Sequence, residues 1–198
     1  MSEQNPIKLK RTTRFIWLIA LASLFSVGCS RQPERKTTPA QPVTAPVGRQ
    51  SFVGRVVSIA DGDTVTVLDA NDAQHRIRLE GIDAPESHQA FGEQSRQSLA
   101  EMISGREVTV SYQKTDQYGR LVGKIVLDGK DINLEQVKAG MAWHYKFYEN
   151  EQTPEDRELY AKAEEVARSS RRGLWQDPNP VEPYQFRKEE KRERGDAR

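Results

Sequence analysis

The sequence has few of the residues on which disulfide-bonded and zinc-binding proteins depend. Its 198 residues include a single cysteine, Cys29, so no disulfide can form within the chain. The 3 histidines are scattered and lack the spacing of zinc ligands: His75, His88 and His144. These shortages exclude a scaffold stapled by disulfides and argue against a metal centre built on nitrogen or sulfur ligands.

An excess of charge of one sign is also missing, and so is a long apolar run. Lysine and arginine total 30 and aspartate and glutamate 29, which leaves a net charge of +1. We therefore expect only modest, salt-dependent attraction to a polyanion such as nucleic acid. The main apolar run, residues 15–27, falls short of the roughly 20 residues that a membrane-spanning helix needs.

Residues 1–29 have the pattern of an export signal. Four basic residues precede the apolar run: Lys8, Lys10, Arg11 and Arg14. The run ends in Ser-Val-Gly-Cys, which resembles the cleavage box of bacterial lipoproteins, with Ser26 where that box usually has leucine. The resemblance implies that Cys29 becomes the acylated first residue of the mature chain. The alternative is an incidental cysteine at the end of an ordinary signal peptide or a short membrane anchor.

This N-terminus predicts an exported protein of the cell envelope. An acylated Cys29 would anchor the chain to a membrane through its lipid. Ser30, the next residue, resembles lipoproteins sent to the outer membrane, and the plasma membrane is the expectation for bacteria without one. Without acylation the protein would be secreted or periplasmic.

The rest of the chain divides by composition into three parts. Residues 30–50 are rich in Pro, Thr, Gln and Ala and have no apolar periodicity, which predicts a disordered linker. Residues 51–176 are long enough for one domain with its own core. Residues 177–198 form a charged C-terminal tail, solvated from residue 187 onwards, with a helical extension as the alternative. We expect a monomer.

Alternation of apolar and polar residues predicts five strands in the central part. They span residues 52–59, 64–69, 74–82, 107–113 and 121–127. In the third strand Ile77 and Leu79 share one face, so Arg78 points away from the apolar stripe. The Asp-Gly pair between the first two strands predicts a hairpin turn, in which Gly62 supplies a positive φ.

Helical spacing predicts two helices after the third strand. The first ends at Gly105, and its inner face carries Phe91, Ser95, Leu99, Met102 and Ile103. The second is short, spans residues 133–140 and begins with Asn133 as its N-cap.

A third helix is predicted between Thr153 and Gly173. Thr153 is its N-cap and Pro154 its first residue, and Gly173 ends it. Its apolar stripe is formed by Leu159, Ala163, Val166 and Ala167. Because a closed barrel leaves no strand edge exposed, we expect an α+β fold: a five-stranded OB-type barrel with three packed helices, preceded by the signal segment and linker.

Three polar clusters stand at the ends of the predicted strands. They are residues 61–64 (Asp-Gly-Asp-Thr), residues 78–86, which run from an arginine to Asp-Ala-Pro-Glu, and residues 116–120 (Asp-Gln-Tyr-Gly-Arg). A hard divalent cation takes oxygen ligands, so Asp63 and Asp83 can hold one. Their neighbour Glu86 is then free to accept a proton.

Two arginines complete the chemistry that these clusters offer. The planar guanidinium groups of Arg78 and Arg120 match a phosphoryl group better than an ammonium does and suit the charge that develops during attack on phosphorus. Together the clusters predict metal-assisted cleavage of a phosphodiester. Each cluster alone also has a plainer interpretation, as a hairpin turn, a proline-fixed loop and a second hairpin, respectively.

In this order and spacing the three clusters resemble the staphylococcal nuclease (thermonuclease-like) family, over residues 52–175. The resemblance implies an OB-type barrel in which Asp63 and Asp83 are calcium ligands. The backbone carbonyl of Ala84 would be a third ligand, although the best-known member has threonine there. Glu86 would activate water.

The resemblance also implies how the substrate is held. Arg78 and Arg120 would bind phosphate, and Tyr118 would line the substrate groove. Either Tyr148 or Tyr145 would stack on a base, because the alignment fits both. Gln117 stands where the best-known member has a lysine near the terminal phosphate, which puts the tightness and end preference of binding in question.

The function implied by the resemblance is a hydrolase: a calcium-dependent endonuclease that cuts DNA, RNA or both and leaves 3′-phosphate ends. The alternative is a non-catalytic OB-fold module that binds single-stranded nucleic acid or a cell-envelope ligand.

Overall fold

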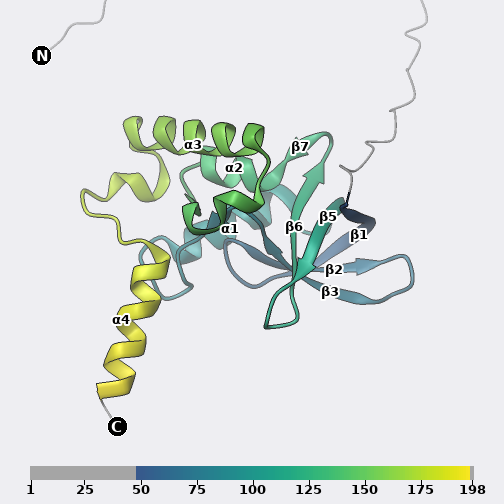
Figure 1. Cartoon of the computed structure of the whole chain (residues 1–198), viewed down its shortest axis with the longest axis horizontal. Helices are drawn as coiled ribbons and strands as arrows, with labels where there is room; N and C mark the ends of the chain where they lie inside the picture. Colours follow the sequence, from purple (N-terminus) through teal and green to yellow (C-terminus); the bar gives the residue numbers. More distant parts are fainter. Residues whose placement is uncertain (1–47, 197–198) are drawn as a thin grey trace, which may run out of the picture. The chain divides into compact units, whose positions relative to one another are not determined.

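The computed structural model describes residues 48–196 (Figure 1). The predictions for the signal segment, for Cys29 and for all but the end of the linker lie outside the described residues. None of the helices in the described part combines the length and apolar character needed to cross a lipid bilayer.

Five long strands form a closed barrel, as the sequence predicts. They are β1 (Gln50–Ile59), β2 (Thr64–Asp69), β3 (Gln74–Leu79), β5 (Glu107–Thr115) and β6 (Leu121–Leu127). Neighbouring strands follow the order β3-β2-β1-β5-β6, and parallel pairing of β3 with β6 closes the barrel. The short β7 (Lys130–Asp131) pairs antiparallel with the end of β6, and β4 (Ile82–Asp83) pairs with β8 (Trp143–His144).

The barrel forms because alternate side chains along its strands are apolar and fill its interior. Val65 and Val67 on β2 and Ile77 and Leu79 on β3 are completely buried. Arg78 lies between the last two and therefore faces the opposite side of the strand, as predicted. This alternation places a guanidinium group outside the barrel, at the edge where β3 meets β6.

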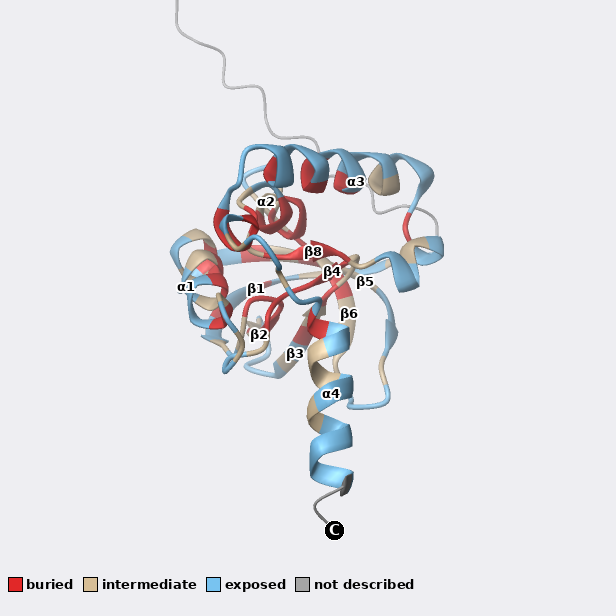
Figure 2. Cartoon of the chain, turned by 90° about the vertical axis from the view of Figure 1, so that its left-hand side faces the viewer, coloured by how far each residue is buried: buried red, intermediate tan, exposed pale blue. Residues whose placement is uncertain are grey.

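The three predicted helices are present as α1 (Gly92–Ile103), α2 (Ile132–Lys138) and α3 (Pro154–Ser169). The structure adds two 3₁₀ helices, η1 (Lys146–Glu151) and η2 (Gly173–Gln176), and a fourth α-helix, α4 (Pro183–Asp196). Helix α1 ends just before Gly105, which has the positive φ expected of a stop signal. Figure 2 shows that the buried residues of α1, α2 and α3 face the barrel side, whereas α4 is mostly exposed.

The predicted cap of α2 is wrong. Asp131 is the N-cap, because its side chain accepts a hydrogen bond from the backbone N–H of Leu134. Asn133 is completely buried instead, where its side chain donates to the carbonyl oxygens of Glu80 and Gly123, each at 3.1 Å. Aspartate and asparagine can both cap a helix. Here Asp131 is the cap, and Asn133 instead connects α2 to the seam between β3 and β6.

The predicted stripe of α3 is confirmed at Ala163 and Ala167 and wrong at Leu159 and Val166. Thr153 caps the helix and Pro154 begins it as expected, but Leu159 and Val166 are 53% and 38% exposed. The buried face runs through Tyr160, with Ala163, Glu164 and Ala167. The tyrosine displaces the leucine because its hydroxyl donates to the carboxylate of Asp131, so the large ring can be buried with its polar end satisfied.

The C-terminal tail differs most from the expectation. The sequence predicts a solvated segment from residue 187, with a helix as the alternative, and the structure has helix α4 there. Its first turn packs against the barrel side through Pro183, which is buried, whereas its second half is exposed and projects away in both views (Figures 1 and 2).

Candidate active site

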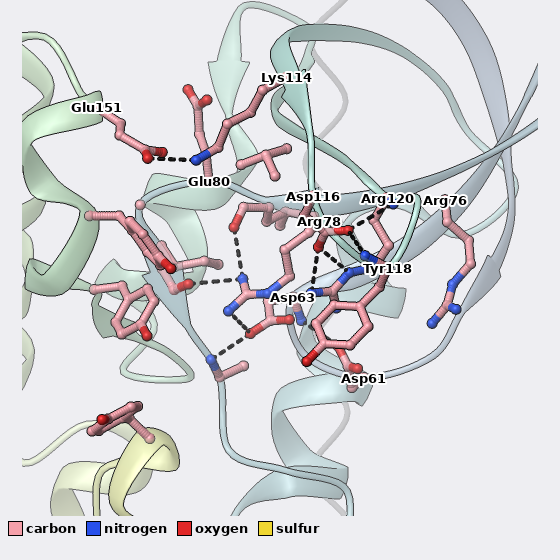
Figure 3. A pocket seen from close by; sticks show the side chains of 18 of the residues that line it. Asp61, Asp63, Arg76, Arg78, Glu80, Lys114, Asp116, Tyr118, Arg120 and Glu151 are labelled. Carbon is pink, nitrogen blue, oxygen red and sulfur yellow. Dashed lines mark hydrogen bonds and ion pairs between the residues drawn. The ribbon is translucent and has the colours of Figure 1, made fainter. Parts of the chain in front are cut away.

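The three polar clusters meet because their strands are neighbours. The turn after β1 leads into β2, which pairs with β3, and β3 pairs with β6, which follows the 116–120 turn. Thr64 and Val122 both lie opposite Arg78 in the register of these pairings. The clusters line one pocket of about 840 Å³, shown in Figure 3.

Most of the predicted site residues lie on the wall of this pocket. They are Asp63, Arg78, Ala84, Glu86, Tyr118, Arg120, Tyr145 and Tyr148. Asp83 does not line it, because this residue is only 1% exposed and lies beneath the wall. Its carboxylate still contacts the pocket through Arg78, whose terminal nitrogen is 2.9 Å from an Asp83 oxygen.

The Asp-Gly turn holds Asp63 in place. The carboxylate of Asp63 accepts a hydrogen bond of 2.7 Å from the backbone N–H of Ala84, so the first cluster is tied to the second. Gly62 has no positive φ, contrary to the prediction; it is needed because a Cβ there would clash with the hydroxyl of Ser95 on α1. The turn is therefore packed against a helix as well as closing a hairpin.

Arg78 joins the two aspartates. One terminal nitrogen lies 2.9 Å from Asp83 and 3.2 Å from Asp63, and the other donates to the carbonyl oxygens of Leu79 and Ile82. These bonds fix the plane of the guanidinium group, which is largely buried. Its position between two carboxylates brings the oxygens of the first and second clusters to one point.

Burial and crowding of negative charge shift the titration of the carboxylates. Burial, followed by the charge of Asp63, raises the pKa of Asp61 to about 6. Burial also raises the pKa of Asp83, an effect that the charge of Arg78 opposes. Cations are therefore favoured partners at this wall of the pocket.

Arg120 is placed by a side-chain-stabilised turn. One oxygen of Asp116 accepts hydrogen bonds from the backbone N–H groups of Tyr118 and Arg120, both at 2.9 Å. The other accepts from Nε of Arg120 at 2.8 Å. Burial acts to raise the pKa of Asp116, but these hydrogen bonds outweigh it and lower the pKa. The turn thus holds Arg120 with one terminal nitrogen 3.4 Å from the hydroxyl oxygen of Thr64.

Glu86 follows Pro85 on the loop between β4 and α1. Its backbone N–H donates to the side chain of Gln89, and its Oε1 accepts from Arg187 at 2.8 Å. Sequence reasoning missed Arg187, because it lies in a run of mixed charge. The signal that could have found it is the pair of aromatic residues Tyr184 and Phe186, which a solvated tail does not need.

Aromatic side chains form one flank of the pocket. Tyr145 and Tyr148 both line it, with ring centroids 5.4 Å apart, so the structure brings together both candidates for a stacking residue. Tyr118, on the opposite turn, is 71% exposed and lies 5.4 Å from the guanidinium of Arg120. Tyr184 of α4 also lines the pocket.

The oxygen donors suit a hard cation, although the described residues hold no cluster of three or more His, Cys, Asp or Glu side chains arranged for a metal. Asp63 and Asp83 supply carboxylate oxygens on either side of one nitrogen of Arg78. Ala84 lies next to both: its N–H donates to Asp63, and it follows Asp83 directly in the sequence. This donor set fits Ca²⁺ or Mg²⁺ better than zinc.

Comparison with known proteins decides the family. Residues 76–177 match the family described as Staphylococcal nuclease homologue. An "Uncharacterized endonuclease" of Haemophilus influenzae is 39% identical over 75% of this chain and 80% of its own length. A "Micrococcal nuclease" of Shigella flexneri is 42% identical over 71% of this chain and 83% of its own length. The chain belongs to the staphylococcal nuclease family.

A plant member is also similar. A "Probable staphylococcal-like nuclease" of Oryza sativa is 34% identical over 72% of this chain and 36% of its own length.

The family match covers residues 76–177, which include the second and third clusters. Asp63 lies before the matched range and Arg187 after it. Nucleases of this family are hydrolases that act on nucleic acids and generally depend on a metal ion.

Proposed function

We propose that the protein is a Ca²⁺-dependent endonuclease that hydrolyses phosphodiester bonds of DNA, RNA or both and leaves 3′-phosphate ends. The observation that carries this proposal is the single pocket around which three separate segments gather two carboxylates, two guanidinium groups and a further glutamate. The nuclease relatives support the same reaction class.

Asp63 and Asp83, with the carbonyl of Ala84, are the residues that would hold the cation. When bound, Ca²⁺ supplies a positive charge that orients a phosphate oxygen and offsets its negative charge. Asp63 is fixed by the N–H of Ala84, and Asp83 by Arg78. Both ligands are thus oriented by the protein before the substrate arrives.

Glu86 is the residue proposed to take the proton from the attacking water. It is the most exposed of the three proposed acidic residues, with a side chain 30% exposed, so water reaches it from the pocket. Arg78, on β3, and Arg120, in the turn before β6, line the pocket and would stabilise the charge that builds up at phosphorus. A donor of this kind contributes about 10²- to 10³-fold in rate in other enzymes.

The aromatic flank favours a substrate with unstacked bases. Tyr118 is exposed at one turn, and Tyr145 and Tyr148 lie at the other side of the same pocket. Each base has a face that can stack on such a ring, whatever its sequence. We therefore propose single-stranded or locally opened nucleic acid as the form bound, with no base-specific readout.

Export of the protein agrees with a weak calcium site. Extracellular calcium modules bind with Kd values of about 10⁻⁴ to 10⁻³ M, so such a site would be mostly empty in the cytosol. We propose that the protein is anchored to the cell envelope by acylation of Cys29. Labelling of cells with palmitate should mark the wild type and not Cys29→Ser, and an unlabelled wild type would contradict the anchor.

Nuclease activity is tested by incubating the full-length protein with plasmid DNA, single-stranded DNA and RNA. Ca²⁺, Mg²⁺ and Mn²⁺ are added one at a time, with EDTA as the control, and the product ends are examined by their need for phosphatase treatment before 3′ extension. Cleavage only with Ca²⁺ and blocked 3′ ends are expected. Binding without cleavage under every metal would instead identify a nucleic-acid-binding module.

A further inference from the structure

Arg187 of helix α4 lines the pocket and pairs with two carboxylates, those of Glu86 on the wall and of Asp83 beneath it. One terminal nitrogen lies 2.9 Å from Oδ2 of Asp83, and the other lies 3.1 Å from Oδ1 of Asp83 and 2.8 Å from Oε1 of Glu86. Both oxygens of Asp83 and one of Glu86 are therefore engaged by one guanidinium group. This is the bidentate arrangement in which arginine binds carboxylates most strongly.

We propose that α4 is an autoinhibitory element, in which Arg187 occupies Asp83 and Glu86 and must leave before a divalent cation binds. The inference rests on the proposed function for the assignment of Asp83 as a cation ligand. Arg187 and the cation need the same carboxylate oxygens, so the two exclude each other. Engagement of Glu86 at the same time withholds the oxygen proposed to accept a proton.

The docking of α4 is limited to its N-terminal half. Gln89 donates to the carbonyl of Val181, just before the helix, and the ring of Phe186 lies 5.2 Å from that of His88, whose Nε2 is 2.9 Å from Glu190. These contacts are with the loop that carries Glu86, and Tyr184 adds a stacked contact with Phe147 of η1, with 6.3 Å between the ring centroids. Beyond Glu190 the helix is exposed.

So small an attachment suits a helix that is released. Exposed contacts such as that between His88 and Glu190 contribute little to stability, and the apolar contacts of α4 are confined to its first turn, with Pro183, Tyr184 and Phe186. The pairing of Arg187 with the two acids is the charged contact that joins α4 to the carboxylates of the site. Replacement of that contact by a divalent cation therefore loosens the docking of α4.

Thermodynamic linkage makes the coupling reciprocal: if docked α4 weakens cation binding, then cation binding weakens the docking of α4 by the same factor. The effect of docked α4 on cation affinity is measured by isothermal titration of Ca²⁺ into the full-length protein and two variants. Arg187→Gln removes the competing charge. Arg192→Gln removes the same charge from an exposed position on the same helix and serves as the matched control.

Arg187→Gln should bind Ca²⁺ about 5- to 150-fold more tightly than the wild type, the usual range of coupling between two sites, and Arg192→Gln should bind as the wild type does. The effect of the cation on the docking of α4 is measured by amide hydrogen exchange: Ca²⁺ should speed exchange of the 183–196 peptide in the wild type. Unchanged or weaker Ca²⁺ binding by Arg187→Gln, or no Ca²⁺ binding by either protein, would overturn the inference.

Plasmid cleavage over a range of Ca²⁺ concentrations separates this inference from the proposed function. Arg187→Gln should reach half of its own maximal rate at a lower Ca²⁺ concentration than the wild type. A loss of cleavage at every Ca²⁺ concentration would show that Arg187 binds substrate and would overturn autoinhibition. If no protein cleaves, yet Arg187→Gln binds Ca²⁺ more tightly, the nuclease proposal fails and the competition stands.

Discussion

The carboxylate of Asp63 accepts a 2.7 Å hydrogen bond from the backbone N–H of Ala84, 21 residues further along the chain. This bond joins the turn after β1 to the loop after β4, so one side chain serves both the shape of the pocket and its proposed cation site. The two contributions can be separated by substitution, because an amide oxygen can accept the same hydrogen bond without the charge.

Asp63→Asn should keep the stability of the fold and lose Ca²⁺ binding, whereas Asp63→Ala should lose both. The alanine variant leaves the buried N–H of Ala84 without a partner, which costs about 1–3 kcal/mol. Urea unfolding and Ca²⁺ titration of both variants measure the two effects. Equal destabilisation of the two variants would show that charge pairing with Arg78, not the hydrogen bond, holds the loops together.

Glu86→Gln should fold normally and lose about 10²- to 10⁴-fold in cleavage rate, the usual contribution of a general base. The amide is nearly the same size as the carboxylate but cannot take the proton. Initial rates on a single-stranded oligonucleotide at saturating Ca²⁺ measure the effect. Glu101→Gln makes the same change at an exposed position of α1 and should cut at the wild-type rate. Full activity of Glu86→Gln would refute its role as base.

Arg78→Lys should lose about 10²- to 10³-fold in rate although it keeps the charge. The guanidinium group of Arg78 contacts Asp63, Asp83 and two carbonyl oxygens at once, and an ammonium cannot reproduce this planar fork. The rate at saturating substrate is the measurement. Arg106→Lys, at an exposed position outside the three clusters and the pocket wall, is the control. Retention of activity by Arg78→Lys would mean that charge alone is sufficient.

The barrel and the proposed site could be predicted from sequence where the signal is local. Apolar residues recur at every second position of β2 and β3, as Val65 and Val67 and as Ile77 and Leu79, so these residues face the interior. Arg78, between the last two, therefore points outward. Spacing and residue type also singled out Glu86 and the other polar residues that the structure places around the pocket.

The features that the sequence did not reveal depend on tertiary contacts. Asp131 and Asn133 are both good capping residues, and only the position of the β3–β6 seam decides which of them is buried. Leu159 is more hydrophobic than Tyr160, yet the partner at Asp131 favours burial of the tyrosine. Helix α4 has almost no apolar periodicity, because its docking depends on Phe186 and on one arginine.

Asn133→Ala should lower the free energy of unfolding by about 3 kcal/mol. The buried amide donates to Glu80 and Gly123 and accepts from the N–H of Ile125, and its loss leaves these groups unpaired where β3 and β6 close the barrel. Urea unfolding followed by tryptophan fluorescence measures the change. Asn71→Ala, in an exposed turn, should change stability by less than about 0.5 kcal/mol. If Asn133→Ala changed stability as little as Asn71→Ala does, water would have replaced the hydrogen bonds of the buried amide.

Tyr160→Phe should destabilise the protein at neutral pH and matter less as the pH rises above 10. The buried hydroxyl donates to Asp131 at 2.9 Å, and its loss should cost about 2 kcal/mol, as for a hydrogen bond to a charged group.

Burial, and then the charge of Asp131, raise the pKa of Tyr160 well above its usual value of 10.0. The unfolded chain therefore releases this proton from about pH 10 while the folded chain retains it, which stabilises the unfolded state by about 1.4 kcal/mol per pH unit. The wild type should lose that part of its stability and the phenylalanine variant should not, so the difference between them should shrink. Urea unfolding of both proteins at pH 8, 10 and 11 tests this, and a constant difference would show that the folded chain also ionises Tyr160 near pH 10.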